Sequence, residues 1–341
     1  MAEKINLSNA VLCALFALWS SGCDNPQSTL YPKGPAASKI AHMSWLMLIL
    51  FLAITVFMWV LLSIAFIRRR GSLAEHAPVD VGGGHGWVLG GGLVLPLIVL
   101  CVLFVLGLRL MSAFPMHAGN HQQSNPEIEI IGHQWWWEVH YLGEPSQQFI
   151  TANEIHIPVG RPVNIELRSG DVIHSFWVPT LHGKVDLVPG MPNFISVEAS
   201  QPGTYRGTCA EYCGAQHAHM RLLVVAQGPE DYEAWIQGQL KPGAEPQTEA
   251  AKNGQQLFLS GPCASCHQVR GTLAGGSVAP NLTHFASRQM IAGNSYPNNE
   301  AYLEAWITHA QSLKPEAQMP DLTQFSGRQL RDIVAYLRQL Q

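Results

Sequence analysis

The sequence predicts a multidomain fold in which a two-helix transmembrane hairpin precedes an antiparallel β-sandwich and an all-α C-terminal domain. Two long apolar stretches lie near the N-terminus, short runs of alternating polarity fill the middle, and a helical apolar stripe closes the chain. We expect the following boundaries: an export signal over 1–23, the hairpin over 39–112, the sandwich over 125–227, a linker over 228–247 and the all-α domain over 248–341.

Composition points to lipid and away from nucleic acid. Of the 341 residues, 47% are hydrophobic and only 13% are charged, about half the usual share of charged residues. The net charge is −4, and no basic run is longer than Arg68 to Arg70. A chain without a basic field cannot attract a phosphate backbone, so nucleic acid is not an expected partner.

The first 23 residues have the pattern of an export signal. Lys4 precedes an apolar run from Ala10 to Trp19, and small residues follow it. The segment Ser20-Ser-Gly-Cys23 resembles a bacterial lipoprotein cleavage site, although Ser20 stands where that pattern prefers leucine. Cys23 is therefore a candidate for lipidation, and plain cleavage or retention of the signal are the alternatives.

Two uncharged stretches are long enough to cross a membrane. Ser44 to Ile67 has 24 residues and Trp87 to Leu108 has 22. At a rise of about 1.5 Å per residue, each can span a hydrocarbon core of about 30 Å. The alternative is a pair of buried core helices. Arg68 to Arg70 directly follow the first stretch, which favours a cytoplasmic connecting loop and both termini outside.

The middle of the chain has the two-residue period of β-strands. Val163, Ile165 and Leu167 alternate with polar residues, and turn formers such as Pro189-Gly190 separate the runs. This spacing predicts an antiparallel β-sandwich of about 100 residues.

A loop between two of these runs concentrates soft metal ligands. Cys209 and Cys213 are followed by His217 and Met220, and His174 lies upstream. Thiolate, imidazole and thioether groups suit copper better than magnesium or calcium. Zinc is an alternative, but it has no use for a thioether, and a blue-copper site needs only one cysteine. Two thiolates can instead bridge two copper ions, and a disulfide between the cysteines is the remaining alternative.

Three segments together resemble subunit II of haem–copper cytochrome c oxidases. Residues 209–220 read Cys-x-Glu-x-Cys-Gly-x-x-His-x-x-Met, and Asp171-Val-Ile-His-Ser and Gly132-His-Gln-Trp lie upstream. The resemblance covers the hairpin and the sandwich. For the sandwich it implies a cupredoxin-like fold. It also implies a binuclear copper A centre with these ligands: His174, Cys209, Cys213, His217, Met220 and the backbone carbonyl of Glu211.

The same resemblance implies further roles. The Glu211 side chain would reach a magnesium or manganese ion shared with subunit I, and Trp135 would be the aromatic that receives electrons from cytochrome c. His219 is a competing copper ligand, but it lies two positions beyond the histidine of the pattern. The sequence departs from the family at one point. Many relatives have a glutamate shortly before the second span that serves a proton path, and this chain has none at that place. Only Glu75 and Asp80 offer a carboxylate nearby.

The C-terminal region carries a haem-attachment motif. Cys263-Ala-Ser-Cys266-His267 predicts thioether bonds from both cysteines to haem c and an axial bond from His267. A redox dithiol or half of a zinc finger are the alternatives. Met319, followed by proline, resembles the second axial ligand of small c-type cytochromes. Met290 is the other candidate after His267.

The combined resemblance is to subunit II of a caa3-type oxidase. It implies a proton-pumping cytochrome c oxidase, in which electrons from cytochrome c or a cytochrome bc1-type or other donor complex pass through haem c and copper A to subunit I, where dioxygen is reduced to water. Expected partners are subunit I, other oxidase subunits and the membrane. We expect a multi-pass protein of the bacterial inner (plasma) membrane with its copper and haem domains on the periplasmic side. A copper A subunit of a nitrogen-oxide reductase and a freestanding membrane-anchored electron carrier are the alternatives.

Overall fold

A computed structural model describes residues 27–69, 84–112, 114 and 126–341. The expected export signal, with Cys23, lies outside the described residues, as do Glu75 and Asp80. The chain divides into two units. One holds residues 39–115, and the other holds the sandwich and the C-terminal domain.

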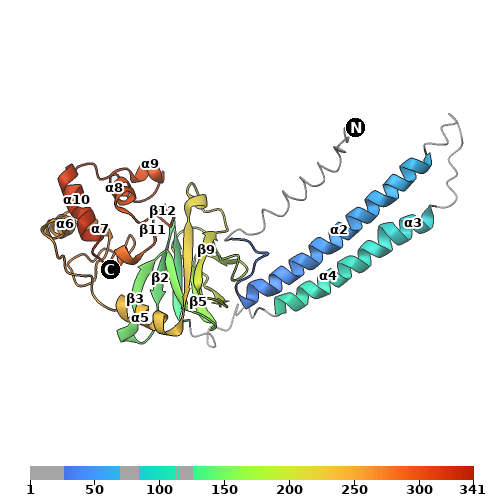
Figure 1. Cartoon of the computed structure of the whole chain (residues 1–341), viewed down its shortest axis with the longest axis horizontal. Coiled ribbons are helices and arrows are strands. Elements are labelled where there is room, and N and C mark those ends of the chain that lie inside the picture. The colour runs from blue at the N-terminus through green and yellow to red at the C-terminus, as the bar shows by residue number, and fades with distance from the viewer. Residues whose placement is uncertain (1–26, 70–83, 113, 115–125) are drawn as a thin grey trace, which may run out of the picture. The chain divides into compact units, whose positions relative to one another are not determined.

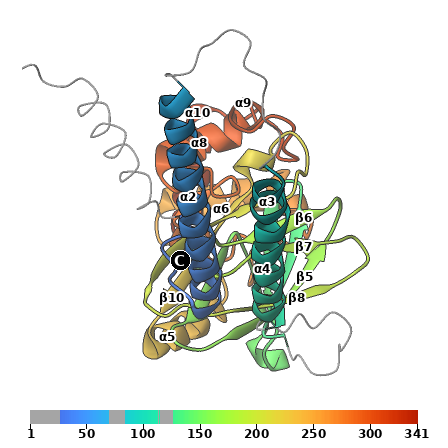
Figure 2. The same cartoon turned by 90° about the vertical axis from the view of Figure 1, so that its right-hand side faces the viewer.

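The first unit is a helical hairpin. Helix α2 spans Pro35–Arg69, and the return segment consists of α3 (His85–Leu89), η1 (Gly90–Val94) and α4 (Leu95–Ser112). Helices α2 and α4 run side by side (Figures 1 and 2). Both arms are long and apolar enough to cross a membrane, with a mean hydropathy of 2.8 in each. Their apolar side chains are mostly exposed, as lipid contact requires.

The return arm contains one irregular turn, because η1 is a π-helix. Pro96 follows it and has no N–H to offer the carbonyl of Gly92, and its ring would crowd that carbonyl in a regular α-helix. A wider turn ahead of the proline relieves this crowding.

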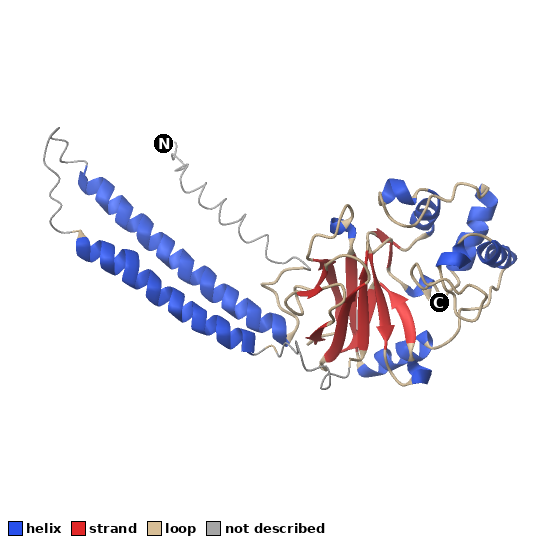
Figure 3. Cartoon of the chain, turned by 180° about the vertical axis from the view of Figure 1, so that it is seen from behind, coloured by secondary structure: helices blue, strands red, loops and turns tan. Residues whose placement is uncertain are grey.

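The second unit begins with the sandwich, whose two five-stranded sheets stack face to face (Figure 3). The first sheet has the order β3-β2-β1-β5-β8 and the second has the order β4-β10-β9-β6-β7. The strands of the first are β1 (Ile128–His133), β2 (Trp136–Tyr141), β3 (Phe149–Ala152), β5 (Val163–Ser169) and β8 (Asn193–Val197). Those of the second are β4 (Glu154–Pro158), β6 (His174–Trp177), β7 (Val185–Leu187), β9 (Gly203–Cys209) and β10 (Arg221–Gln227).

The predicted sandwich is confirmed, with one difference in strand pairing. Most neighbours pair antiparallel, but β1 with β5 and β4 with β10 pair parallel. Such pairs form between strands that are not joined by a hairpin, and period-two alternation does not distinguish their direction. On β5, Val163, Ile165 and Leu167 are buried as predicted. Full burial of each such side chain stabilises the fold by about 1.5–3 kcal/mol.

The segment after the sandwich forms helix α5 (Pro229–Gln239), which packs back on the sandwich core. The Trp235 ring stacks on the His156 ring, with centroids 3.9 Å apart. Residues 229–239 of the expected linker are therefore helical and packed.

The C-terminal domain consists mainly of short helices. They are α6 (Glu249–Ser260), α7 (Cys263–Cys266), α8 (Glu300–Thr308), α9 (Ala310–Leu313) and α10 (Gly327–Leu337), with a small ladder of β11 (Met290–Ile291) and β12 (Tyr296–Pro297). The ladder is the one departure from the expected all-α domain in the part of the chain that the structure describes. Helices α6 and α10 cross at Gly254, where a Cβ would lie 1.8 Å from the backbone oxygen of Asp332. Glycine is what lets the two backbones meet.

Candidate copper and haem sites

The six residues predicted to bind copper gather at one end of the second sheet. His174 begins β6 and Cys209 ends β9, which is paired with β6. The other four, Glu211, Cys213, His217 and Met220, lie on the loop between β9 and β10. A hydrogen bond from Cys209 N to Met220 O, 2.9 Å long, closes that loop at its base. We call residues 209–220 the copper loop.

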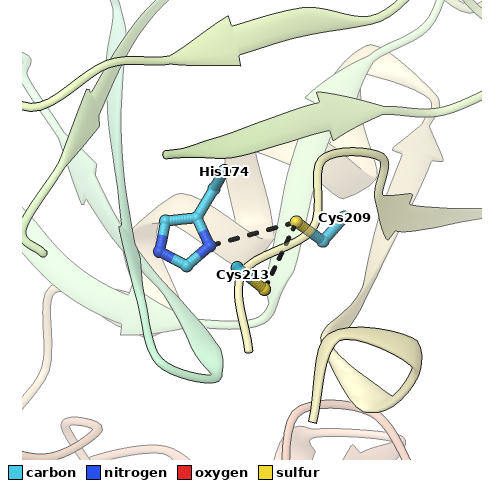
Figure 4. A group of neighbouring side chains, drawn as sticks. All are labelled: His174, Cys209 and Cys213. Atoms are coloured by element: carbon cyan, nitrogen blue, oxygen red, sulfur yellow. Dashed lines mark hydrogen bonds between the residues drawn. The ribbon is translucent and has the colours of Figure 1, made fainter. Parts of the chain in front are cut away.

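The sulfur atoms form the centre of this cluster. The Sγ atoms of Cys209 and Cys213 are 3.8 Å apart. His174 Nδ1 lies 3.9 Å from Cys209 Sγ, and His217 Nδ1 lies 3.6 Å from Cys213 Sγ. Figure 4 shows the His174 ring and both thiols facing a common point, and the ligand atoms of these three residues lie within 4.8 Å of one another.

Two weaker donors complete the set. Met220 Sδ lies 3.8 Å from Cys213 Sγ, and the Glu211 carbonyl oxygen lies 3.2 Å from Cys209 Sγ. Both cysteines are free thiols, so the disulfide alternative is excluded in this structure. The donors are two thiols, two imidazoles, a thioether and a carbonyl, all soft or borderline except the last, and they match a thiolate-bridged copper pair better than a tetrahedral zinc site.

Asp171 holds the His174 ring in place, a role that sequence reasoning missed. Its Oδ1 lies 2.7 Å from His174 Nε2, which leaves Nδ1 directed at the sulfur atoms. Its Oδ2 accepts the backbone N–H of Gln134 at 2.7 Å. Asp171 opens the quoted motif, so its position three residues before the histidine was an available signal.

The electrostatics of the cluster favour a thiolate. The hydrogen bond between the two thiols lowers the pKa of Cys209 and raises that of Cys213, which favours a thiolate at Cys209. Burial lowers the pKa of His174, but hydrogen bonds with Cys209 and Asp171 outweigh burial and the net pKa is raised. A metal ion would displace the remaining thiol proton.

The Glu211 side chain is 44% exposed, and its carboxylate lies 3.5 Å from Lys184 Nζ. The backbone carbonyl of Glu211 thus contacts Cys209, whereas its side chain contacts Lys184. His219 bonds Gln216 through Nδ1 at 2.7 Å, as expected for a loop residue.

The haem motif borders a large cavity. Cys266, His267 and Met319 line it, together with the other candidate ligand, Met290. Cys263 is half-buried against the core of the C-terminal domain. The cavity is mostly apolar, as a porphyrin site should be.

His267 is prepared to bind iron through one nitrogen. Its Nδ1 donates to the Pro280 carbonyl at 2.8 Å, which leaves Nε2 free. Burial lowers the pKa of His267, which favours the neutral imidazole.

One wall of the haem cavity comes from the sandwich. Gln134, Trp135, Trp136 and Asn153 line it opposite the C-terminal residues. Trp135 is 7% exposed, and its Nε1 donates to the Cys213 carbonyl at 2.9 Å. A single indole therefore contacts both the haem cavity and the copper loop.

A segment of the C-terminal domain, residues 288–295, docks on the sandwich beside this wall. Arg221 N donates to Gly293 O at 3.1 Å, and Asn294 Nδ2 donates to Asn153 O at 2.9 Å. The buried Glu154 carboxylate accepts the backbone N–H of Gln289 at 2.6 Å. These bonds fix the orientation of the two domains. Sequence reasoning missed this interface, because no motif marks either side of it.

Comparisons with known proteins agree with the motifs. Residues 143–227 match the family model described as cytochrome c oxidase subunit II, periplasmic domain, and residues 251–341 match that of cytochrome c. A protein of Alkalihalophilus pseudofirmus named cytochrome c oxidase subunit 2 is 34% identical, over 96% of this chain and 95% of its own length. One of the same name from Bacillus subtilis is 29% identical, over 91% and 90%.

A solved structure also matches part of the chain. The periplasmic domain of subunit II of cytochrome oxidase (CoxB) from Bradyrhizobium japonicum is 25% identical, covering 34% of this chain and 94% of that one, with a TM-score of 0.32. At that score the likeness carries no argument about either site.

Proposed function

The chain belongs to the cytochrome c oxidase subunit II family, and we propose that it is the subunit through which electrons enter a proton-pumping caa3-type oxidase. It is a membrane-anchored part of the oxidase complex, and the C-terminal cytochrome c domain is fused to it. Its two soluble domains imply copper A and haem c as cofactors. The observation that carries the proposal is the proximity of two clusters, one of sulfur and imidazole donors and one around the haem motif, on either side of the buried Trp135.

Six residues would hold the copper pair. Cys209 and Cys213 would supply thiolate donors, and His174 and His217 would supply imidazole donors. Met220 and the Glu211 carbonyl would be the weak ligands. The proximity of these donors supports the assignment, and the burial of His174 and Met220 at 0% exposure keeps water from the site.

Four residues would hold the haem. Cys263 and Cys266 would form the thioether bonds, and His267 would bind iron through Nε2. Met319 would be the second axial ligand, because it lines the cavity and its backbone oxygen is fixed by Gln311 Nε2 at 2.8 Å. A thioether opposite an imidazole raises the reduction potential of the iron.

When bound, the two groups would supply one-electron transfer from cytochrome c or another donor complex toward subunit I, where dioxygen is reduced to water. The chain's own residues set the conditions for this. Trp135 fills the space between the haem cavity and the Cys213 carbonyl, and it is buried under the C-terminal domain. We therefore assign Trp135 to contact with the chain's own haem domain rather than with a soluble cytochrome.

The exposed Glu211 carboxylate supports a further assignment. We infer that this carboxylate, which pairs with Lys184 at the surface, would bind a magnesium or manganese ion at a boundary with subunit I, while the carbonyl of the same residue lies 3.2 Å from Cys209 Sγ. A periplasmic location of both soluble domains fits the three arginines at residues 68–70, which directly follow the first apolar stretch and favour a cytoplasmic connecting loop.

The test is spectroscopic, on the complete complex purified from membranes. We expect optical bands of haem c, a near-infrared copper band and the multiline EPR signal of a copper pair. Cys213→Ser should abolish the copper signals and leave the haem c bands, and the matched control Cys101→Ser should leave both. Zinc in place of copper, or retention of the copper signals in Cys213→Ser, would refute the assignment.

A further inference from the structure

Lys314 carries a buried amine where the C-terminal domain meets the copper loop, and burial lowers the pKa of this amine to about 7. It follows α9 and is 3% exposed. Its Nζ donates to the carbonyl of Trp135 at 2.7 Å, and to those of His219 and Ala292 at 3.1 Å each. The first two acceptors belong to the sandwich, and the third belongs to the docking segment of the C-terminal domain.

The acceptors place this amine beside both sites. Trp135 lines the haem cavity and bonds Cys213, and His219 directly precedes Met220 in the copper loop. Lys314 itself also lines the haem cavity. One side chain thus contacts the backbone that frames the copper donors and the wall of the haem cavity.

The surroundings of Lys314 are closely fitted. An ammonium group has three N–H donors, and three carbonyls receive them. A buried charge is costly unless its donors are satisfied, so the pocket must form completely or not at all. Gly293 borders it with φ +66°, and a Cβ there would lie 2.6 Å from Lys314 Nζ and 2.8 Å from Trp135 O. Only glycine leaves room for the amine.

We propose that Lys314 is a positioning residue for electron transfer between the two sites: it fastens the haem domain to Trp135 and His219 and so fixes the distance from haem to copper. The proposal rests on the proposed function and goes beyond it, because neither motif contains this lysine. Without the three bonds, the domains stay tethered by the chain but lose one of the contacts that set their orientation.

The first experiment compares variants of the whole oxidase complex. Lys314→Met has a similar length and no donor. Lys252→Met is the control, because Lys252 is 55% exposed in the same domain. We expect electron transfer from reduced haem c to copper to be about tenfold slower in Lys314→Met than in wild type. Loss of a buried charged donor lowers the equilibrium constant for the docked orientation at least about tenfold, and transfer requires that orientation. Reduction of haem c by external cytochrome c, and the KM for it, should not change.

Lys314→Gln separates donation from general stability. It keeps N–H donors, so its transfer rate should lie between those of wild type and Lys314→Met. Equal rates in wild type and both variants, with both centres fully loaded, would overturn the proposal. Absence of haem c or copper from the wild-type complex would instead overturn the proposed function.

A second measurement needs no variant, and it decides the matter if Lys314→Met fails to load its cofactors. Acetylation of the intact wild-type complex should modify Lys314 at least about tenfold more slowly than Lys252, because the amine is enclosed by three carbonyls. Similar rates for the two lysines would show that the contact is not held, and would overturn the proposal.

Discussion

The copper loop and the haem cavity differ in how far apart in sequence their parts lie. Five of the six copper donors lie between residues 209 and 220, at the end of paired strands, and only His174 comes from elsewhere. The haem cavity combines an attachment motif at 263–267, a methionine at 319 and a wall from residues 134–136 of another domain. The first site depends on one sheet end, whereas the second depends on the packing of two domains. Substitutions should therefore affect the two sites separately.

The largest expected effect is a loss of stability in the C-terminal domain alone. In Gly254→Ala, the new Cβ would meet the backbone of Asp332, so α6 and α10 must separate. We expect a loss of about 3 kcal/mol in the stability of the C-terminal domain. On heating, the haem c spectrum should change to that of the unfolded domain at a lower temperature in the variant than in wild type. The copper EPR signal should disappear at the same temperature as in wild type. If both transition temperatures fall, the two domains unfold together.

The next effect distinguishes the two methionines that line the cavity. If Met319 binds the iron, Met319→Leu should lower the haem c reduction potential by on the order of 0.1 V, a fraction of the ~0.8 V range that axial ligands span. Met290→Leu is the matched control and should leave the potential near that of wild type. Redox titration of the haem c band measures both, and the reverse result would assign Met290 as the ligand.

A change of similar or smaller size affects the copper half alone. Asp171→Asn keeps the shape of the side chain but weakens its hold on His174 Nε2. We expect copper affinity to fall about 10- to 100-fold, as when an outer partner of a metal-binding histidine is lost. Competition with a copper chelator measures this, with the haem c bands as internal standard. Unchanged affinity would mean that the backbone alone orients the ring.

The smallest effect lies on the first sheet, at a carboxylate that binds neither cofactor. Burial raises the pKa of Glu138, but His133 and His140 outweigh burial and lower it to about 2. A lowered carboxyl pKa stabilises the fold above the ordinary value of 4.5, and this contribution is lost as pH falls from 4.5 toward 2. We expect Glu138→Gln to be less stable by about 1 kcal/mol at pH 6 and equally stable at pH 2. Denaturant unfolding at both pH values tests this, and a difference that persists at pH 2 would contradict it.

Features formed by residues close together in the sequence could be predicted, and features formed by distant segments could not. The alternation of Val163, Ile165 and Leu167 was sufficient for a strand, and the spacing of the copper loop predicted that its donors would meet. The parallel pairing of β1 with β5 could not be read, because alternation looks the same in both directions. Nothing in the sequence around Lys314 marks it as buried, since its surroundings come from three distant segments. The ligand roles themselves stay predictions.

The burial of Trp135 beneath the C-terminal domain has a consequence for inheritance. A contact between separate proteins changes through substitutions in two genes, each of which must tolerate the other's present form. Here both faces of the contact, Trp135 and His219 on one side and Lys314 on the other, are encoded in one reading frame. Compensating substitutions on the two sides of this contact are inherited together, and no separate electron-carrier protein has to change with them.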